Sequence, residues 1–322
     1  MENESEVMEA SEGIKKIAVV GAGTIGTSWA TLFAAKGYKV NLHDIKKEYL
    51  EQAFQTVEKN LKLLKENGLV NENITSTLNR IFLTTDLSLA VKDADYVQES
   101  VCERFEVKKV LFAQMDSICS EDVILASSSS GLLMSDIQKF TRNPERCIIA
   151  HPFNPPHLIP LVELVPGKKT SKNTMEVAYR FYLRVGRIPL KVKKEVPGYI
   201  ANRLCAALWR EAIDLVCRDV ASVRDVDLAI CAGPGLRWVL MGPHLIYHLG
   251  GGKGGIEEFV KHLGPAFETW WSSMSSWTSI PPLAVKKIVE GIKEEIGENS
   301  LDELYKWRDE KLLSILKTIS GA

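Results

Sequence analysis

A glycine-rich turn between a short apolar run and a helical pattern constrains the fold more than any other feature of the chain. The turn Gly21–Gly26 follows the β-rich run Ile17–Val20 and opens a helical pattern over Thr24–Lys36. In such a unit the first glycine permits a tight turn, the second lets the backbone approach a pyrophosphate, and the third lets helix and strand pack closely. The amides and dipole of the helix N-terminus favour the phosphate charge. We therefore predict a dinucleotide site that includes Gly21, Gly23, Thr24, Ile25 and Gly26.

An acidic residue at the end of the next β-rich run indicates which dinucleotide binds. Asp44 directly follows the run Val40–His43. A carboxylate at this position accepts hydrogen bonds from the adenosine ribose and repels a 2′-phosphate. NAD is therefore the predicted cofactor rather than NADP, although Lys46 and Lys47 lie close enough to soften the preference.

Short apolar runs alternate with longer helical patterns through the first half of the chain, as in the helix expected over 46–67 and the strand expected over 147–151. This alternation predicts an α/β fold, a Rossmann-type doubly wound parallel sheet with helices on both faces. After about residue 195 only helical patterns continue, so an all-helical C-terminal domain is expected. We predict a disordered extension over 1–14, because that stretch is acidic and polar, an NAD-binding domain over 15–195, and a helical substrate and dimerisation domain over 196–322.

The charge and cysteine content exclude several classes of function. The chain has 40 Lys and Arg residues against 41 Asp and Glu, so it offers no general field for nucleic acid or an anionic membrane. No segment approaches the roughly 18 apolar residues that span a bilayer. The six cysteines form no Cys-x-x-Cys pair, and the N-terminus does not resemble a signal peptide. We predict a cytoplasmic protein that acts on a small molecule, with no nucleic-acid partner, no membrane partner and no metal site.

A histidine and a glutamate in neighbouring apolar runs are the candidates for acid–base chemistry. His151 ends one run, and ligands of open α/β sheets bind at the carboxyl edge of the strands. Glu163 lies within the next run, where a buried carboxylate needs a partner. A His151–Glu163 pair meets that need and supplies the base that NAD-linked oxidation of a secondary alcohol requires. Ser130 and Asn202 are candidates for holding the substrate oxygen; a plain polar loop and a local helix cap are the alternatives.

Together these motifs resemble the 3-hydroxyacyl-CoA dehydrogenase superfamily from Lys16 to about Lys317. The spacings from Ser130 to His151 and from His151 to Glu163 match the family pattern. The resemblance implies that His151 is the general base, that Glu163 is its partner, and that Ser130 and Asn202 hydrogen-bond the substrate oxygen. It also implies a homodimer formed through the helical domain. It places three further residues near the nicotinamide half of the cofactor: Ser100, Glu103 and Lys108.

The tryptophans indicate a position within the superfamily, because four of the seven fall between residues 238 and 277. The segments Gly233–Trp238, Ala207–Ala212 and Leu263–Ala266 are similar to the branch of L-carnitine dehydrogenases and λ-crystallin/L-gulonate 3-dehydrogenases. L-Carnitine is a 3-hydroxy acid with a trimethylammonium group, which aromatic faces bind with about 0.5–2 kcal/mol each. The resemblance thus implies oxidation of L-carnitine to 3-dehydrocarnitine. The candidate substrate residues are Arg237, Trp238, Tyr247, Trp270 and Trp271.

Three alternatives stay open on the sequence alone. The tryptophans can instead fill the helical core or an interface, in which case L-gulonate or an L-3-hydroxyacyl-CoA such as 3-hydroxybutyryl-CoA is the substrate. For the thioester, the lysines of the helix expected over 46–67 can meet a CoA phosphate. A non-catalytic, crystallin-like NAD-binding protein is the alternative from a different class. The presence of Ser130, His151, Glu163 and Asn202 together argues against it.

Overall fold

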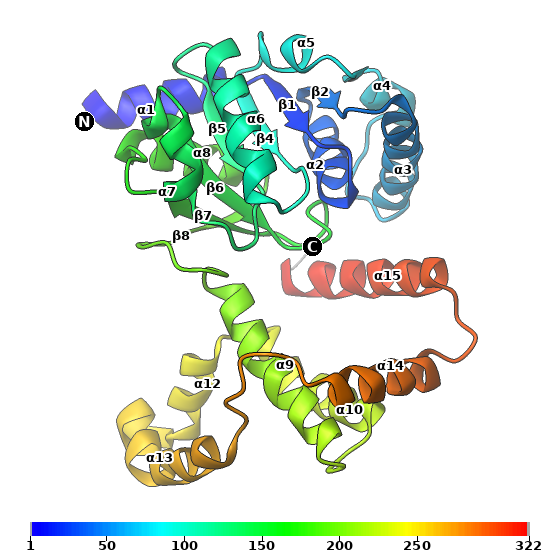
Figure 1. The fold of residues 1–322 in the computed structure, drawn as a ribbon, viewed down its shortest axis with the longest axis vertical. Coiled ribbons are helices and arrows are strands. Elements are labelled where there is room, and N and C mark those ends of the chain that lie inside the picture. The colour runs from blue at the N-terminus through cyan, green and yellow to red at the C-terminus, as the bar shows by residue number, and fades with distance from the viewer. Residues whose placement is uncertain (1, 321–322) are drawn as a thin grey trace. The chain divides into compact units, whose positions relative to one another are not determined.

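The computed structural model describes residues 2–320, which form two compact units (Figure 1). Unit 1 runs to Arg203 and unit 2 begins at Leu204. The predicted boundary after residue 195 falls earlier. The segment after it stays with unit 1 because the amides of Ile200 and Ala201 donate to Glu163. Residue 1 of the predicted extension and residues 321–322 of the predicted helical domain lie outside the described residues.

An eight-stranded sheet forms the centre of unit 1 (Figure 1). Its strands are β1 (Lys16–Val20), β2 (Lys39–His43), β3 (Ile81–Thr84), β4 (Tyr96–Glu99), β5 (Ile124–Ser127), β6 (Cys147–Pro152), β7 (Leu161–Pro166) and β8 (Ile188–Lys191). They lie in the order β3-β2-β1-β4-β5-β6-β7-β8. The strand order reverses between β1 and β4, and ligands of such sheets bind beyond the carboxyl ends of the strands at that point. The glycine turn that follows β1 lies there.

One pair of strands departs from the predicted parallel sheet. β6 and β7 are antiparallel, whereas every other neighbouring pair is parallel. Only residues 153–160 join β6 to β7, which is too few for the crossover helix that a parallel connection needs. The register of this pair places His151 directly opposite Glu163. The spacing of these two residues along the chain therefore follows from a hairpin-like return.

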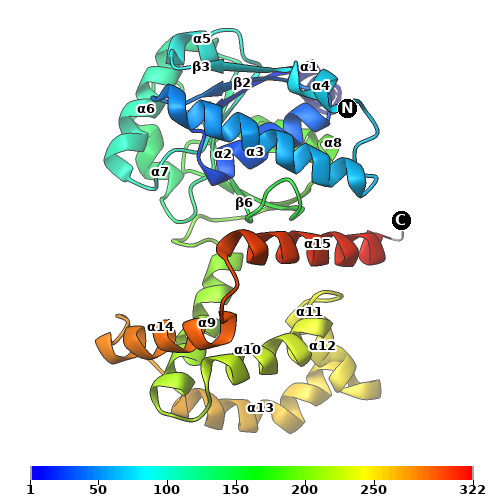
Figure 2. The same cartoon turned by 90° about the vertical axis from the view of Figure 1, so that its right-hand side faces the viewer.

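Helices cover both faces of the sheet. On one face the buried side chains of β1, such as Ile17 and Val19, pack against helices that include Trp29, Val57 and Phe181. On the other face Ala18 and Val20 pack among the remaining helices, which lie along one side of unit 1 in Figure 2. The first group comprises α2 (Thr24–Ala35), α3 (Lys47–Glu66), α4 (Ile74–Leu78) and α8 (Lys172–Arg184). The second comprises α5 (Leu87–Val91), α6 (Phe105–Ile118) and α7 (Met134–Ile137), and the short 3-10 turns η1 (Gln138–Phe140) and η2 (Pro144–Arg146) follow α7.

The predicted disordered extension is wrong over residues 2–13, which form helix α1 (Glu2–Gly13). α1 packs on α8, and the guanidinium of Arg184 donates to the carbonyl of Ser11. Val7 and Ile14 are buried in the same core cluster as β1. The acidic, polar composition of this stretch predicts disorder. The burial of Val7 on α1 and of Ile14 just after it nevertheless holds the helix on the core.

Unit 2 is entirely helical among the described residues. It contains most of α9 (Ala201–Cys217), α10 (Val223–Ala232), α11 (Pro234–Trp238), α12 (Pro243–Gly250), α13 (Gly255–Ser273), α14 (Pro282–Ile296) and α15 (Leu301–Ser320), with the 3-10 turn η3 (Gly252–Gly254). α12 packs on α13, and α10 packs on α11 and α14. α11 and α12 are separate helices, because Pro243 begins a new helix. The buried cluster is small, centred on Val216, Val223 and Val226, so many apolar side chains stay exposed.

Candidate functional site

Two of the three glycines in the turn are required by the protein's own backbone. Gly21 has a φ of +104°, and a Cβ there would lie 2.6 Å from the carbonyl oxygen of Ser100. A Cβ on Gly26 would overlap the carbonyl oxygen of Gly21. Gly23 differs, because a Cβ there would meet no protein atom within 4 Å. The open space over Gly23 is what a pyrophosphate needs for close approach, so the turn fits a dinucleotide. Thr24 and Ile25 begin α2 beside this space.

Asp44 is fixed at the end of β2, next to the turn. Its Oδ2 accepts from the amide of Ala22 at 2.7 Å, and its Oδ1 accepts from the amide of Ile45 at 2.7 Å. A carboxylate has about four acceptor sites, so each oxygen keeps capacity for a further donor such as a ribose hydroxyl. The two amides hold the carboxylate at the glycine turn, as the NAD prediction requires.

His151 and Glu163 form a buried pair at the end of β6. His151 Nδ1 lies 2.9 Å from Glu163 Oε2, and Glu163 is fully buried. Glu163 Oε1 accepts from the amides of Ile200 and Ala201, both at 3.0 Å. Burial alone would raise the pKa of Glu163, but the hydrogen bonds from His151 and from these two amides outweigh it and lower the pKa. The carboxylate therefore stays ionised and also caps the start of α9, a contact that sequence reasoning missed.

The hydrogen bond between His151 and Glu163 bears on which tautomer the imidazole adopts. When Nδ1–H donates to Glu163, the neutral ring presents Nε2 as its acceptor. Two aromatic rings flank His151, with centroid distances of 5.3 Å to Phe153 and 5.5 Å to Tyr199. The imidazole is therefore held on its Nδ1 side and against two rings, and its other nitrogen can take a proton from a hydroxyl group.

The serine loop, residues 127–132, begins with the last residue of β5. Its four serines have different environments, which separates Ser130 from a plain polar loop. Ser127 Oγ donates to Glu99, Ser128 Oγ accepts from Gln98, and Ser129 Oγ donates to Glu103. Ser130 is exposed, and its hydroxyl makes only a 3.4 Å contact with Glu103 Oε1. Three serines thus build the loop, and the hydroxyl of the fourth is free to meet a ligand.

Asn202 lies next to this exposed serine. Its Nδ2 donates to the carbonyl of Ser130 at 3.1 Å. An amide nitrogen has two protons, so one remains for a substrate oxygen. The structure therefore brings Ser130 and Asn202 into contact. Glu163, which binds His151, also binds the amides of Ile200 and Ala201, directly before Asn202 in the chain.

The three residues expected near the nicotinamide form the support of the serine loop. Glu103 Oε1 accepts from Ser129 Oγ and from the amides of Ser130 and Gly131. Burial alone would raise the pKa of Glu103, but these hydrogen bonds and the charge of Lys108 lower it. Ser100 Oγ lies 2.9 Å from Ser128 Oγ.

Lys108 is almost completely buried, and its Nζ lies 2.6 Å from Glu99 and 3.5 Å from Glu103. Lys108 therefore holds the last residue of β4, Glu99, close to Glu103 in the loop that follows. Glu99, which also binds Ser127, was missed by sequence reasoning. The sequence feature that could have indicated Glu99 is a carboxylate at the end of a buried strand, because a buried carboxylate needs a positively charged partner nearby.

Three of the five predicted substrate residues gather in one aromatic cluster of unit 2. The ring of Phe267 lies 5.4 Å from Tyr247, 4.8 Å from Trp270 and 5.9 Å from Trp271. Both tryptophans are more than half exposed, at 53% and 64%. Phe259 stacks on Tyr247 at 4.8 Å. Phe259 and Phe267 were missed, although their helical spacing with Trp270 and Trp271 on α13 indicates a shared face.

The other two predicted substrate residues lie apart from this cluster on α11. Arg237 and Trp238 are both exposed, and Arg237 forms no ion pair within residues 2–320. An exposed, unpaired guanidinium is available for a carboxylate.

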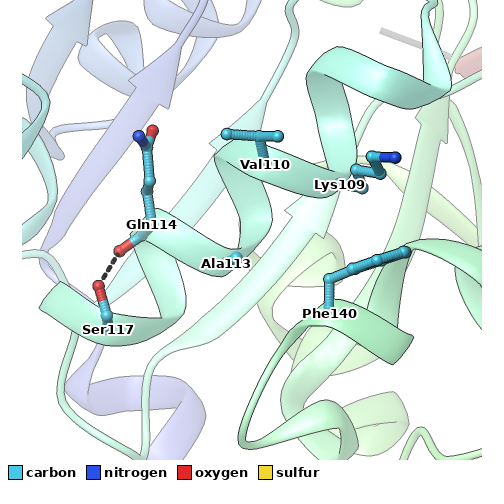
Figure 3. Close-up of a pocket in the computed structure, with 6 residues that line it drawn as sticks. All are labelled: Lys109, Val110, Ala113, Gln114, Ser117 and Phe140. Carbon is cyan, nitrogen blue, oxygen red and sulfur yellow. Dashed lines mark hydrogen bonds between the residues drawn. The ribbon is translucent and has the colours of Figure 1, made fainter.

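An open groove of about 350 Å³ on unit 1 contains none of the predicted site residues (Figure 3). It lies between α6 and η1, and the ammonium of Lys109 lies over the rings of Phe105 and Phe140. The lining residues are Lys109, Val110, Ala113, Gln114, Ser117 and Phe140. The ammonium of Lys109 pairs with Glu106, and the hydroxyl of Ser117 donates to the carbonyl of Gln114. These lining groups are not arranged for acid–base or nucleophilic chemistry, so the groove is not the candidate active site.

The fold and the site define a class of protein. Residues 16–196 match the NAD binding domain of 3-hydroxyacyl-CoA dehydrogenase, and residues 198–290 match its C-terminal domain. The chain belongs to the 3-hydroxyacyl-CoA dehydrogenase family and is an NAD-dependent oxidoreductase that acts on a CH–OH group. The predicted family, fold class and cofactor are confirmed.

Individual relatives define the similarity further. The chain is 40% identical over 306 residues to an L-carnitine dehydrogenase of Bacillus cereus, covering 95% of this chain and 93% of the relative. It is 38% identical over 310 residues to one of Streptomyces coelicolor, covering 96% of each.

Solved structures give the same picture at lower identity. A 5-formyl-3-hydroxy-2-methylpyridine 4-carboxylic acid 5-dehydrogenase, an NAD⁺-dependent dismutase, superposes with a TM-score of 0.82 at 26% identity, covering 96% and 99% of the two chains. The 3-hydroxybutyryl-CoA dehydrogenase of Escherichia coli gives 0.69 at 29% identity, covering 88% of this chain and 58% of that one. No helix among residues 2–320 combines the length and apolar character needed to cross a membrane.

Proposed function

We propose that the protein oxidises the 3-hydroxyl group of L-carnitine to 3-dehydrocarnitine with NAD⁺. The observation that carries the substrate assignment is the similarity to curated L-carnitine dehydrogenases, at 36–40% identity over almost the whole chain. The arrangement around His151 supports the reaction type, because the buried His–Glu pair is linked through the amides of Ile200 and Ala201 to the segment that carries Asn202, whose side chain binds the exposed Ser130.

In the proposed mechanism His151 Nε2 accepts the proton of the substrate hydroxyl. Glu163 holds the Nδ1 proton, fixes the tautomer and stabilises the imidazolium that forms. The hydroxyl of Ser130 and the free amide proton of Asn202 hold the substrate oxygen while it loses its proton. NAD⁺, when bound, would supply the acceptor for the hydride that leaves the carbinol carbon. The glycine turn and Asp44 would hold the two ends of its adenosine diphosphate.

The aromatic cluster of unit 2 is proposed to recognise the trimethylammonium group. A quaternary ammonium donates no strong hydrogen bonds and is attracted to aromatic faces. Trp270 and Trp271 expose such faces and, like Tyr247, contact the ring of Phe267, and Trp238 is exposed on α11. Arg237 would pair with the carboxylate of the substrate. Replacing Trp270 or Trp271 by Ala is expected to raise KM for L-carnitine about tenfold or more, with much less effect on KM for uncharged-tailed 3-hydroxybutyrate. Equal effects on both substrates would refute this role.

The state of the protein in the cell is also part of the proposal. The apolar side chains of unit 2 left exposed beside its small buried cluster support a homodimer formed through this unit. The six cysteines are all unpaired, which supports a reducing compartment and hence the cytoplasm. Analytical ultracentrifugation tests the homodimer, since a monomer at micromolar concentration would contradict it.

A substrate panel tests the proposed function. NADH formation is measured with L-carnitine, L-gulonate, 3-hydroxybutyrate and 3-hydroxybutyryl-CoA at equal concentration. We expect the highest kcat/KM with L-carnitine. Turnover of the CoA thioester alone would assign the protein to acyl-CoA oxidation, and turnover of none would support the non-catalytic alternative.

A further inference from the structure

Tyr199 contacts both His151 and the loop that carries Ser130, although it is not among the predicted site residues. Its side chain is 1% exposed. Its ring lies 5.5 Å from the ring of His151, at an interplanar angle of 62°. Its hydroxyl donates to the carbonyl of Leu132, at 2.8 Å, in the serine loop. The next two amides along the chain, those of Ile200 and Ala201, bind Glu163.

The backbone at this residue is unusual for a bulky side chain. Tyr199 has a φ of +49° and follows Gly198, whose φ is +76°. A non-glycine residue in the left-handed region is disfavoured, and it persists where the surrounding structure over-determines it. Glycine would adopt this turn with less strain. The contacts of the ring with His151 and of the hydroxyl with Leu132 therefore hold a large aromatic residue in a turn that does not itself favour one.

The serine loop is held from three directions. Glu103 binds the amides of Ser130 and Gly131, Asn202 binds the carbonyl of Ser130, and Tyr199 binds the carbonyl of Leu132. Removing the Tyr199 hydroxyl leaves the Leu132 carbonyl without this donor and frees the end of the loop that follows Ser130.

Tyr199 does not exchange a proton itself. Burial is the largest influence on its phenol and raises the pKa well above the usual range. The hydroxyl therefore stays protonated at neutral pH and acts as a fixed donor.

We propose that Tyr199 is a positioning residue for the dehydrogenase reaction, whose ring fixes the imidazole of His151 and whose hydroxyl fixes the loop that carries Ser130. The general base and the group that holds the substrate oxygen then share one support. This role rests on the proposed chemistry of His151 and Ser130, but it is independent of which 3-hydroxy acid is the substrate.

A double-mutant cycle tests the hydroxyl. Tyr199→Phe keeps the ring and is expected to lower kcat about tenfold, with KM and NADH affinity changed less than about twofold. In a Ser130→Ala background the same change is expected to cost less than about twofold, because the loop no longer presents a hydroxyl. Tyr179→Phe, a half-buried tyrosine of α8, is the matched control and should leave kcat unchanged. Full multiplicativity of Tyr199→Phe and Ser130→Ala would overturn the proposal.

A second pair of variants tests the ring. Tyr199→Leu is expected to lower kcat about tenfold further than Tyr199→Phe, because His151 loses its aromatic neighbour. Glycine adopts the left-handed backbone readily, so Tyr199→Gly keeps the turn even if the leucine variant does not fold. The glycine variant is expected to show the same loss of kcat as Tyr199→Leu. Retention of the Tyr199→Phe rate by the glycine variant would overturn the role of the ring. All rates are measured with the panel substrate that the parent protein turns over fastest. The test of Tyr199 therefore does not depend on L-carnitine being the substrate.

Discussion

Replacement of Glu163 by Gln probes the proposed catalytic pair most severely, because the carboxylate serves three donors. Oε2 faces Nδ1 of His151, while Oε1 accepts from the amides of Ile200 and Ala201. A glutamine has one acceptor oxygen and one donor nitrogen. If its oxygen keeps the two amides, its NH₂ donates to Nδ1 and moves the ring proton to Nε2. If its oxygen instead accepts from Nδ1 of His151, its NH₂ group faces the amide N–H groups of Ile200 and Ala201 and cannot accept hydrogen bonds from them.

The expected magnitude follows from these two outcomes. In the first, Nε2 carries a proton and cannot accept another, so kcat should fall about 10³–10⁴-fold, equivalent to about 4–5 kcal/mol. In the second, two buried amides lose a charged acceptor, and the free energy of unfolding should fall by about 2 kcal/mol. KM should change little, because Glu163 is fully buried and does not reach the substrate.

The assay is steady-state NADH formation together with thermal and denaturant unfolding. Glu176→Gln is the matched control, since Glu176 lies on α8 in pairs with Arg180 and Lys191 outside the site. The parent rate should be retained in this control. A Glu163→Gln protein that keeps kcat within about threefold of the parent would refute the role of the carboxylate.

The lowered pKa of Glu163 adds a pH dependence to the same experiment. The pKa lies below the ordinary value of 4.5 in the folded protein, so the unfolded chain binds this proton more readily. The contribution to stability is therefore complete above about pH 4.5 and is lost as the pH falls through the folded pKa. Glu163→Gln should lack this part of the acid sensitivity, whereas Glu176→Gln should keep it.

Two further predictions separate chemistry from cofactor binding. His151→Ala should lower kcat by about three orders of magnitude or more while NADH affinity stays within about twofold, as measured by fluorescence titration; normal turnover would contradict the assignment of the base. Gly23→Ala should unfold at the parent temperature but bind NADH about tenfold more weakly, because its Cβ meets only the space for the pyrophosphate. Gly26→Ala, whose Cβ overlaps the Gly21 carbonyl, should instead lose about 2 kcal/mol or more of stability. Equal behaviour of the two alanine variants would contradict this reading of the turn.

The features that the sequence predicted correctly are local in the chain. The glycine turn, Asp44 and the alternation of strands and helices depend on neighbouring residues, so short-range patterns reveal them. The pairing of His151 with Glu163 was also predictable, because a carboxylate in an apolar strand needs a partner. The antiparallel return that creates this pair was not predicted, since strand direction depends on the length and path of a connection.

The missed features depend on contacts between distant segments. Lys108 was a candidate residue and Glu99 was not, although the two form one buried ion pair. The helix over 2–13 packs on the rest of unit 1 because Val7 is buried in the core cluster that includes residues of α8. Only its contacts with His151 and Leu132 distinguish Tyr199 from the other aromatic residues of the chain. Composition and periodicity do not contain such information, because each contact joins residues that are far apart in the chain.

The central claim is that the hydrogen on the carbinol carbon of L-carnitine is transferred to NAD⁺ at the His151 site. The most direct test supplies L-carnitine labelled with deuterium at C3 and analyses the reduced cofactor by mass spectrometry. We expect one deuterium in each NADH formed and a lower kcat/KM than with unlabelled substrate. Formation of unlabelled NADH, or no NADH from L-carnitine while a CoA thioester is oxidised, would contradict it.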